Sequence, residues 1–154
     1  MSHHEVDKFI GKTMASDFQD IRQAAELLSK MTEEGKGLHD ENLVSDIHKI
    51  GHFLTSRSHN HFSLEERIGA SSSIVEQRPR LEGPLRKLQA DYATFDKIIA
   101  KIKTRLDAVS LAQPESFDLL ASELETYRAL LKVHAEKETL FVLDAQNIEI
   151  GVGD

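Results

Sequence analysis

Four segments of this sequence carry apolar residues at alternating steps of three and four, and this spacing constrains the fold more than any other feature. It places the apolar side chains on one face of an α-helix, as in helix bundles. No segment shows the two-residue alternation of a half-buried strand. The stripes run through a shorter first segment (Met14, Phe18, Ile21, Ala25, Leu28), a second (Leu43, Ile47, Ile50, Leu54, Arg57, His61, Leu64, Ile68), a third (Leu81, Leu85, Leu88, Tyr92, Phe95, Ile99, Ile102, Leu106) and a fourth (Phe117, Leu120, Leu124, Tyr127, Leu131, His134, Glu138, Phe141).

Glycine and proline are scarce, and they separate the four segments. The breaks between the segments lie at residues 35–37, 69–84 and 112–114. Pro84 fits a helix only near its start, because deeper inside it would remove a hydrogen bond and clash with the preceding turn. Three short connections between helices of this length favour an antiparallel up-down-up-down four-helix bundle. We therefore expect an all-α fold and a single domain over residues 1–154, with a core from about 14 to 144.

The composition excludes several classes of function. A formal charge of −7 argues against nucleic acid as the main partner, because phosphate binding needs clustered Lys and Arg. No apolar run approaches the ~20 residues of a membrane span, and the first residues lack the apolar stretch of a signal peptide. We therefore expect a cytoplasmic protein without a membrane partner. The sequence has no cysteine, so thiolate metal sites are excluded.

Two polar pairs interrupt the apolar stripes. His61 and Glu65 lie in the second stripe, and His134 and Glu138 lie in the fourth at the same four-residue spacing. That spacing stacks both side chains on one helix face, so both can point at one centre. A buried carboxylate needs a cation, a proton or a hydrogen-bond partner. A metal bound by imidazole and carboxylate supplies the cation, and such ligands suit iron, manganese or zinc. The alternative is a buried His–Glu hydrogen-bond network without a metal.

The two pairs resemble the signatures of the hemerythrin-like family, also called the HHE cation-binding domain. The resemblance is carried by His61-Phe-Ser-Leu-Glu65-Glu66 and by His134-Ala-Glu-Lys-Glu138-Thr-Leu-Phe141, and it spans residues 14 to 144. It implies two metal ions, usually iron, in the centre of the bundle. By this resemblance His61 and His134 are terminal ligands, and Glu65 and Glu138 bridge the metals.

The ligand set is smaller than the one that the resemblance implies. Tyr92 stands where the family has a histidine in the third helix, and Phe18 stands where it has one in the first. Phenylalanine cannot bind a metal. Tyr92 can bind ferric iron as a phenolate, or its hydroxyl can hydrogen-bond to a glutamate. Two ions completed by solvent, a single ion bound by the four remaining residues, and an empty site are all compatible with this set.

Three functions follow from these alternatives. The first is a metal-binding protein, with one or two iron ions, that binds, senses or stores O2, NO or iron itself. The second is a degenerate, metal-free bundle that acts as an interaction module. The third, a carboxylate-metal enzyme, is least favoured, because no separate acid, base or substrate pocket is recognisable. Imidazole must be neutral to bind a metal, so the first function predicts that affinity falls below about pH 6.

Overall fold

The computed structural model describes residues 3–34, 41–71 and 74–152, and within them the side chains of residues 17–34, 41–67, 69, 76–141 and 143. The expected core residues Met14 and Ile68 lie outside the described side chains. Four long helices are present, and the described residues form no strand. The all-α prediction is therefore confirmed. The elements are α1 (His3–Glu34), α2 (Glu41–Ser71), α3 (Ile74–Gln77), the 3-10 turn η2 (Pro79–Leu81), α4 (Glu82–Ala108) and α5 (Glu115–Val152).

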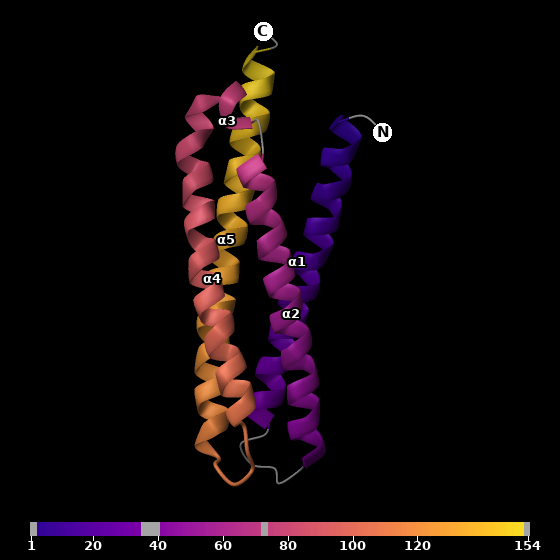
Figure 1. Ribbon diagram of the computed structural model, residues 1–154, viewed down its shortest axis with the longest axis vertical. Coiled ribbons are helices and arrows are strands. Elements are labelled where there is room, and N and C mark those ends of the chain that lie inside the picture. Colours follow the sequence, from indigo (N-terminus) through magenta and orange to yellow (C-terminus); the bar gives the residue numbers. More distant parts are fainter. Residues whose placement is uncertain (1–2, 35–40, 72–73, 153–154) are drawn as a thin grey trace.

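The long helices run alternately up and down, as Figure 1 shows. Each one packs against its neighbours in the chain, and α1 also packs against α5, which closes the bundle. Helix α1 is 32 residues long, so the prediction of a shorter first helix was wrong. The predicted stripe started at Met14, although Val6, Phe9 and Ile10 precede it at helical spacing, and the length was therefore underestimated. None of the helices in the described ranges is long and apolar enough to cross a lipid bilayer.

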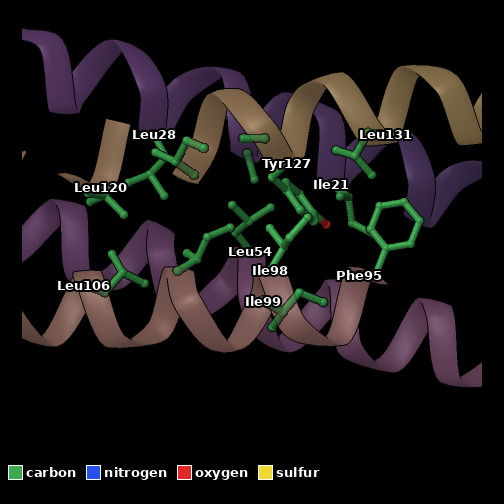
Figure 2. Close-up of a cluster of buried hydrophobic side chains, with 14 of the residues drawn as sticks. Ile21, Leu28, Leu54, Phe95, Ile98, Ile99, Leu106, Leu120, Tyr127 and Leu131 are labelled. Carbon is green, nitrogen blue, oxygen red and sulfur yellow. The ribbon is translucent and has the colours of Figure 1, made fainter. Parts of the chain in front are cut away.

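The apolar stripes of all four long helices meet in one core, part of which is drawn in Figure 2. Ile21, Leu54, Ile102 and Leu120 are each no more than 1% exposed. Burying such a side chain fully stabilises the fold by about 1.5–3 kcal/mol. The core side chains shared by the stripes and the structure are Ile21, Ala25, Leu28, Ile47, Leu54, Tyr92, Phe95, Ile99, Ile102, Leu106, Phe117, Leu120, Leu124, Tyr127 and Leu131.

The two connections around α4 are built from the residues that the sequence singles out as helix breakers. Pro79 begins the 3-10 turn η2, and Pro84 lies in the first turn of α4, as predicted. After α4, Ser116 Oγ donates a hydrogen bond to the carbonyl of Gln113 (2.6 Å) and accepts one from the amide of Ser110 (3.1 Å). These bonds hold the short loop between α4 and α5, and they make the two helices antiparallel neighbours.

At Gly51, α2 packs closely against the side chain of Leu106 on α4. A Cβ added there would overlap both terminal methyl groups of Leu106, which is 1% exposed. At Gly69, by contrast, an added Cβ would make ordinary contacts of 3.6 and 3.7 Å. Each Gly→Ala change gains about 0.5–1 kcal/mol of helix propensity, but overpacking at Gly51 costs about 1–3 kcal/mol. We expect Gly51→Ala to be less stable than Gly69→Ala by about 1–3 kcal/mol, measured by urea unfolding. Equal unfolding free energies would contradict the close approach.

Candidate metal centre

The two predicted His–Glu pairs lie together in the bundle, one on α2 and the other on α5. His61 follows the core residue Leu54 by two helical turns, and His134 follows Leu131 by one. His61 is 2% exposed, Glu65 5% and His134 0%. Glu138 is only partly buried, with 34% of its side chain exposed. The pairs therefore lie at one end of the apolar core, and Glu138 forms the side nearest to solvent.

Glu65 lies between the two imidazoles. Its Oε1 is 3.1 Å from Nε2 of His61, and its Oε2 is 3.2 Å from Nε2 of His134. Nε2 of His134 also lies 3.0 Å from Oε1 of Glu138. Nε2 of His134 thus faces the carboxylates of Glu65 and Glu138, and the carboxylate of Glu65 faces the rings of both histidines. This is the arrangement expected of a bridging glutamate, although Glu138 contacts only one of the two rings at these distances.

His61 is buried without a hydrogen bond. Neither of its ring nitrogens has a hydrogen-bond partner among the described residues, because the approach of Glu65 lacks hydrogen-bond geometry. A buried polar nitrogen without a partner costs about 1–3 kcal/mol. Its surroundings are the rings of Phe18 and Phe62, with centroids at 5.9 and 5.1 Å. Such an unsatisfied nitrogen beside a carboxylate fits a position that a cation would complete.

Aromatic rings enclose the imidazole of His134. Phe62 and Phe95 stack on each other with centroids 4.0 Å apart and planes at 7°. Both meet His134 edge to face, at 5.6 and 5.2 Å, and Tyr92 does so at 5.8 Å. These rings separate the polar cluster from water on the core side. Charge interactions inside the cluster are therefore stronger than they would be in water.

The cluster strongly perturbs the pKa values of its members. Burial acts to lower the pKa of His134, but contacts with Glu138, Glu65 and Asp91 outweigh it and raise that pKa to about 10. Burial raises the pKa of Glu138 to about 7, against the opposing contact with His134. Burial also acts to raise the pKa of Glu65, but contacts with His134 and His61 hold that pKa well below its usual range. Without a bound ion, His134 is therefore protonated at neutral pH.

Tyr92 and Phe18 lie beside the cluster on opposite sides. Tyr92 is 7% exposed and contacts His134, whereas Phe18 contacts His61. Burial, and then the charges of Glu65 and Glu138, raise the pKa of Tyr92 well above its usual range. Tyr92 is therefore a neutral phenol in this arrangement. Its role as a phenolate ligand stays a prediction, and a hydroxyl directed at Glu65 suits the structure better.

Two residues of the cluster were not predicted from the sequence. Asp91 on α4 accepts a hydrogen bond from Nδ1 of His134 at 2.9 Å. Lys137 on α5 donates to both Asp91 oxygens, at 3.0 and 3.1 Å. The available signals were weak: Asp91 precedes Tyr92 outside the apolar stripe, and Lys137 lies three residues after His134. Neither position shows in sequence alone that it reaches the buried ring.

Three of the predicted ligands can meet at one point. Glu65, His134 and Glu138 each offer a ligand atom, and these atoms lie within 4.8 Å of one another. Within the described part of the chain, no other group of three His, Asp or Glu side chains meets this condition. His61 lies outside the group and reaches it through Glu65. The donor set of one imidazole and two carboxylates suits iron, manganese or zinc.

The fold and the cluster together define a class, a four-helix bundle with an imidazole–carboxylate group in its core. The family model described as the hemerythrin HHE cation binding domain matches residues 12–142. The chain therefore belongs to the hemerythrin family of HHE cation-binding domains. Comparison with curated proteins and with solved structures finds no significant match to either.

Proposed function

We propose that this chain binds one transition-metal ion, iron in the first place, between Glu65, His134 and Glu138, and that it takes up a small species such as O2 or NO there. The observation that carries the proposal is the meeting of three ligand atoms within 4.8 Å in the bundle core. The unpaired nitrogens of His61 add a second argument, because a cation beside Glu65 would satisfy one of them. The preference for iron, and for O2 or NO, rests on the family alone.

The two carboxylate oxygens of Glu65 differ in the number of potential metal ligands beside them. On the His134 side, Glu65 and Glu138 both lie within 3.2 Å of Nε2, so three residues can share one ion. On the side of His61, the described residues supply only His61 and Glu65, with Phe18 packed against the ring. One ion per chain is therefore favoured over two. An ion with only three protein ligands keeps coordination positions open for a small ligand.

Metal titration of the purified chain tests the proposal. Fe2+ without oxygen, and separately Mn2+ and Zn2+, are added to the metal-free protein and counted by elemental analysis. We expect one ion per chain. At 100 times Kd it should stabilise the fold by about 2.7 kcal/mol, a rise in Tm of roughly 5–10 °C. Exposure of the iron-loaded protein to NO should then change its visible absorption.

Each result of the titration has a clear meaning. Two ions per chain would contradict the single position and restore a paired centre at Glu65. No bound ion and no change in Tm with any of the three metals would overturn the proposed function. An unchanged spectrum of the iron-loaded protein in the presence of NO would reject the small-ligand part alone.

A metal-free interaction module is the second candidate, and one observation favours it. The cluster has internal charge compensation, because protonated His134 and Lys137 face Glu65 and Asp91 while Glu138 is close to half protonated at neutral pH. A buried network whose charges balance in this way can exist without an ion. The titration separates the candidates, since stoichiometric metal in the wild-type protein rejects the metal-free module.

A further inference from the structure

Asp91 lies on the side of the His134 ring that faces away from Glu65 and Glu138. It comes from α4, whereas the other carboxylates come from α2 and α5. Its Oδ2 is 2.9 Å from Nδ1 of His134, and 19% of its side chain is exposed. Lys137 holds both oxygens of Asp91, at 3.0 and 3.1 Å. The carboxylate is thus fixed from two directions, by the imidazole and by the ammonium.

This contact determines which nitrogen of His134 can bind a cation. A carboxylate only accepts hydrogen bonds, so Nδ1 must carry a proton where it faces Asp91. A neutral imidazole has one proton, and Nε2 is then left with a free lone pair. Nε2 is the atom that lies 3.2 Å from Glu65 and 3.0 Å from Glu138. Without an ion, Nε2 carries a proton toward Glu65 as well. When the ring gives up one proton to a cation at this position, Asp91 keeps the remaining proton on Nδ1, so the lone pair of Nε2 is available to the ion.

His61 has no such partner. Neither of its nitrogens is hydrogen-bonded within the described residues. The two histidines have the same four-residue spacing to a glutamate, but only His134 has its ring orientation and tautomer fixed. Fixing the ring before an ion arrives raises affinity, because less freedom is lost on binding.

We propose that Asp91, held by Lys137, is a positioning residue that keeps His134 in the Nδ1–H form and presents Nε2 to a cation at Glu65 and Glu138. The inference rests on the proposed function of this cluster. It predicts that removal of Asp91 weakens ion binding without removing any ligand atom. Loss of such an outer partner typically costs about 10–100-fold in metal affinity.

Asp91→Ala and Asp96→Ala form a matched pair of variants for the test. Both remove one carboxylate from α4, but the side chain of Asp96 is 60% exposed and lies 4.0 Å from the surface residue His59. The Zn2+ affinity of each variant is compared with that of the wild type by competition with a chelating dye. We expect a loss of about 10–100-fold for Asp91→Ala and less than about threefold for Asp96→Ala.

A spectroscopic measurement separates positioning from a general effect on folding. In Zn2+-loaded wild-type protein, the imidazole 15N shifts of His134 should show Nε2 bound to metal and a proton on Nδ1 that exchanges slowly with solvent. In Asp91→Ala that proton should exchange rapidly. Asp91→Asn should recover most of the affinity, because its amide oxygen can occupy the place of Oδ2, which accepts from both His134 and Lys137. Rescue by the amide shows that the acceptor is needed.

The results distinguish this inference from the function on which it rests. If the wild type binds Zn2+ and Asp91→Ala binds it equally well, the positioning role is overturned and the cation site stands. If Asp91→Asn is as weak as Asp91→Ala, with both folded by circular dichroism, the hydrogen-bond acceptor is not what matters and the inference also fails. If the wild type itself binds no ion, both the proposed function and this inference are overturned.

Discussion

Replacement of Glu65 by glutamine is expected to abolish cation binding while leaving the bundle folded. Glu65 contacts both imidazoles, through Oε1 to His61 and through Oε2 to His134. Glutamine keeps the shape but loses the negative charge, and only one of its two terminal atoms can accept a hydrogen bond or bind a metal. Loss of an outer-shell partner costs up to about 100-fold in affinity, so loss of this ligand should cost at least about 100-fold.

The fold should tolerate this substitution for a reason specific to the site. The amide oxygen can still accept from His134, and the NH2 group takes the place of Oε1 beside Nε2 of His61, which has no hydrogen-bond partner within the described residues. The neighbouring Glu66→Gln is the matched control, since it removes the same charge from an exposed side chain of the same helix. Calorimetric titration with Zn2+ and thermal unfolding measure both effects. Undiminished binding by Glu65→Gln would remove Glu65 from the site and leave no bridge between the two histidines.

The positions of the four predicted ligands followed from the sequence because periodicity reports which helix face is buried. His61 and His134 each occupy a place where an apolar side chain is expected, and both are buried. Membership of the hemerythrin family, predicted from the same residues, is confirmed over residues 12–142. Helical spacing alone thus defined the bundle and the two pairs.

Periodicity does not encode the contacts that cross between helices, and the differences between the two pairs arise there. Both pairs have the same spacing, but His134 has partners at both nitrogens and His61 at neither. Asp91 reaches His134 only because α4 packs beside α5 in one particular register. The stripe steps from Leu88 to Tyr92 and passes over Asp91, so the pattern treats Asp91 as a surface residue. Tertiary packing, and not local pattern, makes it part of the cluster.

The sequence also does not show which side chains pack around each candidate ligand. From the sequence, Phe18 was interpreted as a lost ligand and Tyr92 as a candidate phenolate ligand or hydrogen-bond partner of a glutamate. In the structure both rings pack against an imidazole. The stacked pair of Phe62 and Phe95 also closes the site on the core side, and Phe62 lies outside the predicted stripe. Whether an ion is bound depends on this enclosure and on the charge balance, which no spacing rule describes.

Ion affinity is expected to rise steeply with pH across the neutral range, about tenfold per pH unit for each proton released. A metal can bind Nε2 of His134 only after the ring loses one proton, and the pKa of that ring is raised to about 10 without the ion. Glu138 must also lose its proton, and its pKa is about 7. Above pH 7 one proton is therefore released, and below it up to two. With an unperturbed imidazole, ion affinity would depend on pH only below about pH 6. The carboxylates around His134 therefore move the pH range in which affinity changes upward.

The stability of the metal-free protein should fall as pH rises, whereas the ion affinity rises. The pKa of His134 is higher in the folded protein than the ordinary value of 6.5, so its contribution to stability is fully present below pH 6.5 and is lost as pH rises through about 10. The raised pKa of Glu138 acts with the same sign, and its contribution, present below pH 4.5, is lost as pH rises through about 7. The rise in Tm caused by Zn2+ should therefore grow from about pH 6 to about pH 8.5.

Thermal shifts with and without Zn2+, and titration calorimetry in buffers of different ionisation enthalpy, measure this coupling directly. The calorimetry counts the protons released per ion, and near pH 8 we expect about one. His134→Gln is the informative comparison, because it removes the group that must deprotonate; any residual binding should lose most of its pH dependence above pH 7. Equal affinity at pH 6 and pH 8 in the wild type would show that His134 gives up no proton to the ion and is not a ligand. Release of one proton from the wild type and none from this variant would instead assign the released proton to the imidazole of His134.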